Sequence, residues 1–289
     1  MLIVQKLKDY QQLMKLNLSM LVVFSCLAGY IIVPDLKIDF LKLIWLFIGG
    51  TLVTAAANAS NEILEQHTDA LMRRTKTRPL PAARMHKSEA ILFSTICLVI
   101  GLLILYLQFN ALSAIISLIS YALYVFVYTP LKKVSPVSVF IGAIPGSLPC
   151  LIGWVAGTNH IGSLAAWTLF IIQFFWQFPH FWSIAWIGHE DYEKAGMKML
   201  PRVEKAGYFT AFQCVLYSAV LIPLSVLPMV SLEGSLISAI PMCIAASWFL
   251  YNSMNFLKDN SDSKARKVMF ASFIYLPVVL IALVADKYF

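Results

Sequence analysis

The chain has 289 residues, of which 60% are hydrophobic and 13% are charged, and its formal net charge is +7. So few charged residues cannot give a soluble domain an ordinary hydrated surface, so most of the surface must face lipid. Lys and Arg form short clusters between apolar segments, which argues against a nucleic acid as partner. The composition predicts an integral membrane protein.

Nine apolar segments are each long enough to cross a bilayer, which takes about 20 helical residues. They are residues 18–34, 40–57, 89–108, 111–129, 137–157, 164–187, 208–229, 235–252 and 268–285. No convincing small-residue cleavage site follows the first segment, so we expect a retained helix and not a signal peptide. The predicted fold class is an all-α membrane bundle of about nine transmembrane helices. It forms one domain over residues 1–289, in which 1–17 is a cytoplasmic N-terminal segment.

The distribution of Lys and Arg predicts the orientation, because basic residues near helix ends stay on the cytoplasmic side. The N-terminal segment and alternate loops contain all 22 basic residues except Lys37, Lys42 and Lys287. The fourth of these cytoplasmic segments contains Lys194, Lys198, Arg202 and Lys205. We therefore expect a multi-pass protein of the cell inner membrane with a cytoplasmic N-terminus and an external C-terminus.

Two cytoplasmic segments, residues 58–88 and 188–207, are much longer than the external connections. Long loops in a compact fold usually carry function. These two occupy equivalent places in two predicted units of four helices, with a ninth helix added, and they hold seven of the chain's 15 acidic residues. We expect both to be functional loops.

The first of these loops begins with oxygen-bearing side chains. Four of them share an arc of about 80° if the second predicted helix continues through them: Asn58, Asn61, Glu65 and Asp69. Carboxylates and amides at that density suit Mg²⁺, which also takes water and substrate phosphate oxygens as ligands. The alternative is an ordinary solvated helix face.

A basic run follows at once and contains Arg74, Lys76 and Arg78. Pro79 disfavours helical geometry at Arg78, so the helix should end about there. Arg is suited to bidentate capture of phosphate or carboxylate. The positive-inside rule explains basic residues but not acids and bases in one loop. The mixture indicates a metal-bridged diphosphate, with the basic side chains neutralising the remaining charge.

The second functional loop contains three acids within four residues, at Glu190, Asp191 and Glu193, with Tyr192 between them. They could bind a second metal, although Glu190 and Lys194 also have the spacing of an ordinary helical ion pair. The equivalent position of the two loops favours the functional interpretation.

The sixth predicted helix carries a polar stripe. Gln173, Gln177 and His180 share one face inside a membrane span, where polar groups usually face a cavity, and Pro179 is expected to kink the helix. Six of the ten residues 173–182 are aromatic and could stack on a planar ligand or stabilise a cation. A hydrogen-bonded core histidine is the alternative for His180.

Six sequence blocks occur in order over about residues 55–205. They are Asn61-x3-Glu65-x3-Asp69; Met72-x-Arg74-Thr75-Lys76-x-Arg78-Pro79-Leu80; Tyr128-Thr129-Pro130-Leu131-Lys132-Lys133-x-Ser135-Pro136; Ile141-Gly142-x3-Gly146-x2-Pro149-x-Leu151-Ile152-Gly153-Trp154; Trp176-Gln177-x-Pro179-His180-Phe181-Trp182; and Asp191-Tyr192-x3-Gly196-x2-Met199-Leu200-Pro201. Together they resemble the protohaem IX farnesyltransferases (haem O synthases) of the UbiA-type prenyltransferase superfamily. Many members have aspartate where this chain has Glu65, whereas residues 208–289 match only as apolar helices.

The resemblance implies a helical bundle around a central cavity, with farnesyl diphosphate and protohaem IX (haem b) as substrates and Mg²⁺ bound with the diphosphate. It implies metal ligation by Asn61, Glu65, Asp69 and Asp191, and a catalytic set that adds Asn58, Arg74, Lys76 and Arg78. The implied substrate-binding residues are His180, Gln177, Tyr192, Glu190, Lys132 and Lys133. For the two lysines, topology-setting charge is an equal alternative, and His180 is the candidate for haem contact because imidazole commonly ligates haem iron. A haem A synthase or a terminal oxidase is the implied protein partner.

Two other functions remain open from the sequence. A quinone-precursor prenyltransferase of the same fold would use the same diphosphate site with an aromatic acceptor. A haem or small-molecule transporter would explain the helices and the polar stripe. Transporters place substrate groups near the membrane midplane, however, whereas these acids lie together at one face.

Overall fold

The computed structural model describes residues 2–201 and 208–289, and within these ranges the chain forms helices and no β-strand. The elements are α1 (Leu2–Met14), α2 (Leu16–Ile31), α3 (Phe40–Asp69), α4 (Lys87–Gln108), α5 (Ala111–Ala122), the π-helix η1 (Leu123–Tyr128), α6 (Thr129–Leu131), α7 (Ser138–Thr158), α8 (Leu164–Ile187), α9 (His189–Lys194), α10 (Tyr208–Leu224), α11 (Pro228–Ser231), α12 (Leu236–Lys258) and α13 (Asp262–Asp286). Arg202 and Lys205, two of the basic residues expected to be cytoplasmic, lie outside the described residues, as does the end of the functional loop 188–207.

Each predicted apolar segment corresponds to a helix, but the count of nine crossings is not confirmed. Among the described residues, seven helices are long and apolar enough to span a membrane, and an eighth is added if the bent pair α1 and α2 is one span. The count of eight leaves out one predicted span, α8, although its 24 residues are enough to cross a bilayer. Its polar residues Gln173, Gln177 and His180 reduce its mean hydropathy.

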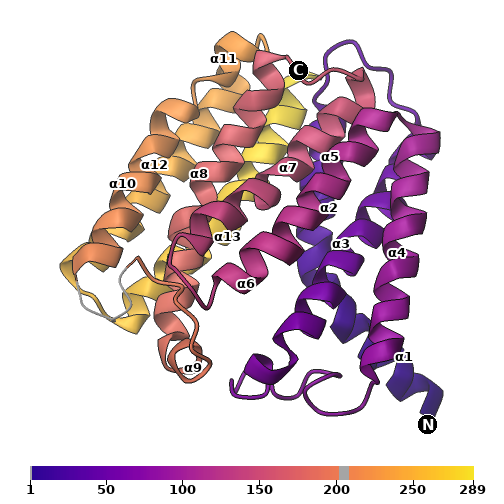
Figure 1. The fold of residues 1–289 in the computed structure, drawn as a ribbon. Coiled ribbons are helices and arrows are strands. Elements are labelled where there is room, and N and C mark those ends of the chain that lie inside the picture. Colours follow the sequence, from indigo (N-terminus) through magenta and orange to yellow (C-terminus); the bar gives the residue numbers. More distant parts are fainter. Residues whose placement is uncertain (1, 202–207) are drawn as a thin grey trace.

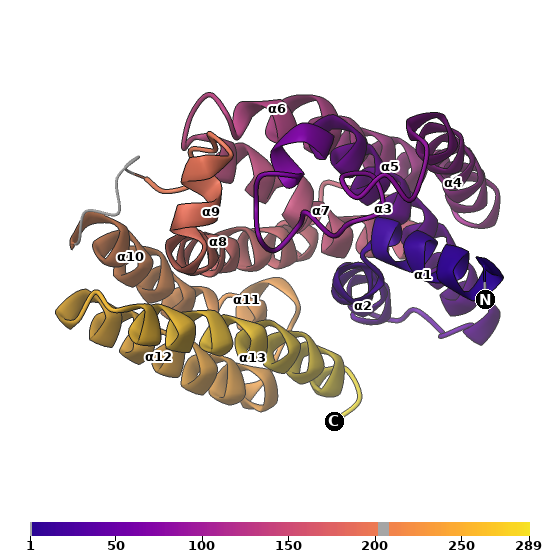
Figure 2. The ribbon, with the colours of Figure 1, turned by 90° about the horizontal axis from the view of Figure 1, so that it is seen from below.

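The long helices lie side by side, and the two ends of the chain are at opposite ends of the bundle (Figure 1). In the middle, α7 packs against α8; α2 and α5 pack on α7, while α10 and α13 pack on α8. Seen from below, the α3–α4 pair and the α12–α13 pair lie on opposite sides of this centre (Figure 2). The loop after α3 and the short helix α9 are at the same end of the bundle (Figure 1).

Glycines allow α2 and α7 to cross at close range. A Cβ atom added at Gly29 would lie 2.2 Å from the carbonyl oxygen of Cys150, and one at Gly153 would lie 1.8 Å from that of Cys26. In lipid, where helices gain little from the hydrophobic effect, such close backbone packing supplies much of their attraction. This contact holds α2 against the centre of the bundle.

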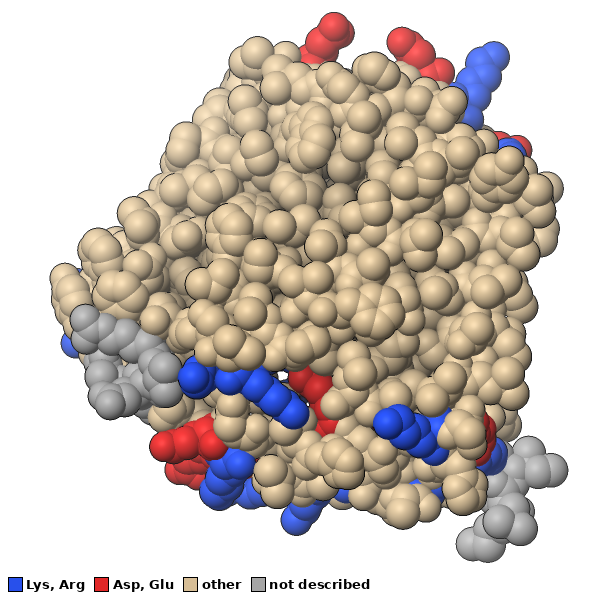
Figure 3. All heavy atoms as spheres, in the orientation of Figure 1, with Lys and Arg blue, Asp and Glu red and all other residues tan. Residues whose placement is uncertain are grey.

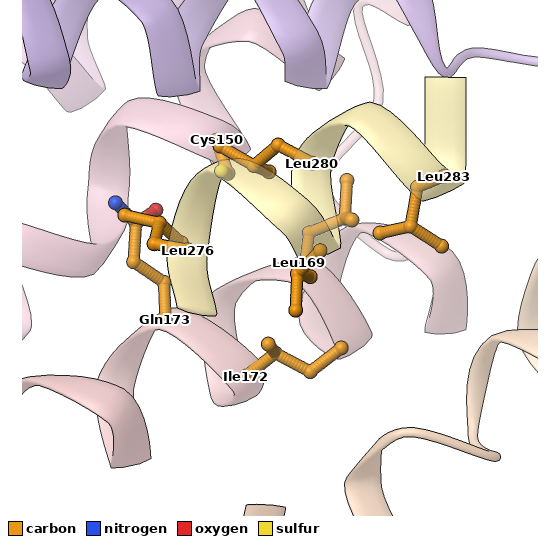
Figure 4. A pocket seen from close by; sticks show the side chains of 8 residues that line it. Cys150, Leu169, Ile172, Gln173, Leu276, Leu280 and Leu283 are labelled. Carbon is orange, nitrogen blue, oxygen red and sulfur yellow. The ribbon is translucent and has the colours of Figure 1, made fainter. Parts of the chain in front are cut away.

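A narrow apolar gap remains between α7, α8 and α13 (Figure 4). It contains about 200 Å³ of space between atoms and is lined mainly by aliphatic side chains, among them Leu169, Leu276 and Leu280. Gln173 contributes the one amide of this lining. The gap is a feature of helix packing and offers little polar chemistry.

The surface divides into an apolar belt and charged ends. Large apolar side chains are widely exposed, including Phe40 at 75%, Leu107 at 70% and Ile244 at 65% of their area. On the face seen in Figure 3, Lys, Arg, Asp and Glu are absent from the belt and gather mainly at the lower edge, where acidic atoms are visible in a hollow between basic side chains. A surface of this kind is that of a multi-pass membrane protein.

The helix that carries the first acidic cluster continues through it, as expected, but it ends earlier than predicted. α3 stops at Asp69 and not near Arg78, and residues 70–86 form turns. The carbonyl oxygen of Asp69 accepts hydrogen bonds from the backbone N–H of Met72 and the hydroxyl of Thr75, at 3.3 and 2.8 Å. These bonds satisfy the end of the helix locally, so the chain turns before Pro79 can influence it. The segment 58–88 is therefore partly helix, and α1 occupies most of 1–17.

Candidate active site

One side of α3 carries a row of buried polar groups. Asn61, Glu65 and Asp69 are 2%, 4% and 1% exposed, one helical turn apart. Asn58 is buried too, but its amide donates to the carbonyl of Met14 at 3.0 Å and to Ser19 Oγ at 3.1 Å. Asn58 thus anchors the junction of α1 and α2, while the other three form the row predicted from the helical spacing.

The row is bonded to its surroundings by specific contacts. Asn61 Nδ2 donates to Glu65 Oε2 at 2.8 Å and to Thr129 Oγ1 at 3.1 Å. Lys132 Nζ lies 2.5 Å from Glu65 Oε1, and Arg78 Nη1 lies 2.6 Å from Asp69 Oδ2. Both carboxylates are therefore charge-paired inside the protein, which is how buried charges are tolerated.

The π-helix η1 and the short α6 bring the Tyr-Thr-Pro block to this row. Thr129 Oγ1 donates to the carbonyl of Tyr124 at 2.9 Å, and the Lys132 ammonium lies 5.0 Å from the centre of the Tyr128 ring. A π-helical turn is rare and is found frequently at functional sites. Here it lets residues far from α3 in the sequence contact Asn61 and Glu65.

The second acidic cluster meets the loop after α3 through Arg73. Arg73 Nη2 lies 2.8 Å from Glu190 Oε2, and its Nε lies 3.2 Å from Asp191 Oδ1. The Asp191 carboxylate also accepts hydrogen bonds from the backbone N–H groups of Arg73 and Arg74. Burial opposes its charged form, but the bonds from Arg73 outweigh it and hold the pKa of Asp191 below its ordinary value.

The remaining basic candidates are at the surface. Arg74 is exposed and donates to Tyr192 Oη at 3.3 Å, which links the two loops again. Lys76 and Lys133 are exposed. The structure thus brings Glu190, Asp191 and Tyr192 to the loop after α3, but it does not place Lys76 or Lys133 within the buried row.

The predicted metal ligands have suitable chemistry but are engaged elsewhere. In residues 2–201 and 208–289, no three His, Cys, Asp or Glu side chains are grouped as a metal centre. Glu65, Asp69 and Asp191 each contact a basic side chain. Their hard oxygen atoms still fit Mg²⁺, which prefers a few carboxylates together with substrate phosphate oxygens. The ligand set stays a prediction.

The polar stripe of α8 is hydrogen-bonded to three neighbouring helices. Gln173 Nε2 donates to Ser25 Oγ at 3.1 Å on α2, and Gln177 Nε2 donates to Ser147 Oγ at 2.8 Å on α7. His180 Nδ1 lies 2.8 Å from Ser272 Oγ on α13, and its ring stacks on Trp176 with centroids 5.0 Å apart. These contacts support the alternative of a hydrogen-bonded core histidine, and haem contact by His180 stays untested.

Two residues at the row were missed by sequence reasoning. Glu62 is fully buried, and its carboxylate interacts electrostatically with Arg78 and Lys15. The helical wheel that aligned Asn58 with Asp69 places Glu62 only about 40° from Asn58, so it could have been included. Lys15 donates to Asn61 Oδ1 at 2.8 Å. Nothing in its sequence context distinguishes it from a topology-setting charge.

Comparisons with known proteins identify the family of the chain. Residues 22–274 match the model of the UbiA prenyltransferase family. The protoheme IX farnesyltransferase of Christiangramia forsetii is 43% identical, with 98% of this chain and 94% of the relative covered. That of Cytophaga hutchinsonii is 44% identical, with 96% and 97% covered.

Solved structures show the same fold. A digeranylgeranylglyceryl phosphate synthase superposes with a TM-score of 0.80 at 25% identity, covering 98% of this chain and 99% of its own. A UbiA homologue from Archaeoglobus fulgidus bound to GPP and Mg²⁺ has a TM-score of 0.66 at 15% identity, covering 95% and 99%. By its sequence and its fold, the chain belongs to the UbiA prenyltransferase family.

Proposed function

We propose that this protein transfers the farnesyl group of farnesyl diphosphate to a vinyl group of protohaem IX and so forms haem O. The observation that carries the proposal is the buried row Asn61, Glu65 and Asp69, with basic partners suited to a diphosphate. The acceptor is inferred from the near full-length relatives, which are farnesyltransferases of protohaem IX. A transporter would have no need of buried carboxylates combined with basic side chains suited to a diphosphate.

The residues at the α3 end would hold the metal and the leaving group. Asn61, Glu65, Asp69 and Asp191 would ligate Mg²⁺, whose charge, when bound, would stabilise the departing diphosphate. Arg78 and Lys132 are within ion-pair distance of two of these ligands, so their charges are already directed at this place. Arg74 and Lys76, on the adjoining loop, would neutralise the outer phosphate oxygens.

The reaction requires a bond between farnesyl C1 and oxygen to break, with the electron pair leaving on the diphosphate. A haem vinyl carbon then attacks C1, and water adds to the resulting cation with loss of a proton, which completes the hydroxyethylfarnesyl group. Burial of the row would limit the access of bulk water to the allylic cation. His180 would contact the haem, with Gln177, Tyr192, Glu190 and Lys133 as further substrate-binding candidates.

We also propose a location and an orientation for the protein. Residues 1–289 would form one membrane-embedded domain of the cell inner membrane, with its N-terminus and both functional loops in the cytoplasm. Haem O is a cofactor precursor, so a haem A synthase or a terminal oxidase would be the partner that receives it.

A reconstitution assay tests the proposal. Purified protein is incubated with haem b, farnesyl diphosphate and Mg²⁺, and haem O is sought by mass spectrometry, in parallel with a quinone-precursor aromatic acid as acceptor. We expect haem O and no prenylated aromatic acid. Prenylation of the aromatic acid alone would identify the quinone-pathway alternative. If neither acceptor is prenylated, the proposed prenyl transfer is contradicted.

A further inference from the structure

Lys15 occupies an unusual place at the break between α1 and α2. Its backbone is left-handed, with φ 48° and ψ 53°, a conformation that costs a residue other than glycine about 1–2 kcal/mol. Asn58 and Ser19 fix this break by donating to the carbonyl of Met14. The conformation directs the Lys15 ammonium to Asn61 Oδ1 on α3, at 2.8 Å. Such strain in a non-glycine residue is typical of functional sites.

Lys15 completes a set in which every predicted ligand has one basic partner. Lys15 contacts Asn61 Oδ1, Lys132 contacts Glu65 Oε1, Arg78 contacts Asp69 Oδ2, and Arg73 contacts Asp191 Oδ1, at 2.8, 2.5, 2.6 and 3.2 Å. The four basic residues come from three segments of the chain: the α1–α2 junction, the loop after α3, which supplies both Arg73 and Arg78, and the residue after α6. Their convergence on one ligand set is therefore a product of the fold and not of local sequence.

This arrangement opposes the binding of a divalent cation alone. The cation would have to displace basic side chains from its ligand oxygens while remaining within a few ångströms of their positive charges, and repulsion at that range is strong in a protein interior. A diphosphate changes the balance, because its oxygens can accept the bonds that the basic side chains give up. Cation and diphosphate then stabilise each other's binding, which is a reciprocal linkage.

We propose that Lys15 is a further member of the diphosphate site. We also propose that the four basic side chains of this site, those of Lys15, Arg73, Arg78 and Lys132, make the binding of a divalent cation conditional on a bound diphosphate. The proposal rests on the function proposed above for this site, but it concerns only the diphosphate half of the reaction. In it, Lys15 and Lys132 contact Asn61 and Glu65 in the empty site and contact the diphosphate once it is bound.

Mn²⁺ binding to the full-length protein in detergent tests this linkage, with free Mn²⁺ followed by electron paramagnetic resonance. For the wild type, we expect Mn²⁺ to bind at least about tenfold more tightly when farnesyl thiolodiphosphate, an unreactive analogue, is present. Tight binding of Mn²⁺ without the analogue would overturn the proposal, and this measurement needs no variant.

Variants locate the effect. Lys15→Gln and Lys132→Gln should each bind Mn²⁺ alone at least about tenfold more tightly than the wild type and bind the analogue more weakly in Mg²⁺. The matched control is Lys8→Gln, which removes one exposed charge from α1, and Lys132→Arg retains the charge; both should keep wild-type Mn²⁺ affinity. Unchanged Mn²⁺ affinity in the two Gln variants would make these lysines structural. No haem enters the experiment, so a failure of the haem acceptor in the reconstitution assay is distinguished from a failure of the linkage.

Discussion

Lys132 and Glu65 form an ion pair of 2.5 Å in which both side chains are less than a tenth exposed. The pair connects the segment after the π-helix to the middle of the buried row on α3. Removing one partner of such a pair leaves an uncompensated buried charge, whereas removing both does not. The pair is thus both a structural link and the charge partner of a predicted metal ligand.

Breaking this pair should cost stability in a way that the double variant reverses. We expect Lys132→Ala to lower the free energy of unfolding by about 3–5 kcal/mol, because Glu65 would then be buried without its partner. Lys132→Ala combined with Glu65→Ala should be less destabilised than the sum of the two single variants. Thermal unfolding in detergent measures the four members of this cycle. Simple additivity would show that the pair contributes no coupling energy.

Asp69→Asn tests whether the buried Asp69 carboxylate takes part in catalysis. Asparagine keeps the size and hydrogen-bonding capacity of Asp69 but removes its charge, so haem O formation should fall by at least about tenfold, which corresponds to about 1.4 kcal/mol of transition-state stabilisation. Protein levels should change little. The exposed acid-to-amide variant Glu233→Gln serves as control. Full activity of Asp69→Asn would leave the acidic row without a role in catalysis.

His180 variants distinguish a haem contact from a core histidine. If it contacts haem, His180→Ala should weaken haem binding or turnover and leave farnesyl diphosphate binding nearly intact, and His180→Gln should behave in the same way because an amide ligates iron poorly. Ser272→Ala removes the present partner of His180 and should have a smaller effect on haem binding. Equal loss of both substrates, with reduced thermal stability of the protein alone, would assign His180 to packing with Trp176 and Ser272.

The close crossing of α2 and α7 makes Gly153 sensitive to a single methyl group. The added Cβ would lie 1.8 Å from a backbone carbonyl oxygen, so Gly153→Ala should destabilise the protein by about 1–3 kcal/mol as the helices separate. The same substitution at Gly50 meets nothing closer than a Val23 methyl at 3.7 Å and should be tolerated. Unfolding temperatures measured side by side check the difference. A Gly153→Ala protein as stable as Gly50→Ala would show that the crossing can relax freely.

Reporter fusions test the orientation. A reporter fused after Lys76 should behave as cytoplasmic and one fused at Asn159 as external, because the basic residues are concentrated on the side of Lys76. The two positions lie on opposite sides of the predicted bundle, so they control for each other. The reverse pattern would overturn the proposed orientation.

The sequence by itself determined the features that depend on local periodicity. Apolar length predicted the helices, and the helical repeat of about 3.6 residues aligned Asn61 with Glu65 and Asp69, because neighbours along one helix have a geometry that no other part of the chain can change. The same repeat explains why Glu62 could have been included. The number of membrane crossings was less secure, because the polar groups of α8 make its composition ambiguous.

Only the tertiary structure decided which side chains these groups meet. Lys15 reaches Asn61 because α1 and α2 break beside α3, and Lys132 reaches Glu65 because a π-helical turn redirects the chain. The stripe on α8 likewise separates into contacts with three helices, although its residues share one face. Such pairings depend on how distant segments pack, and a basic residue near a helix end has the same local pattern whether it sets topology or enters a site.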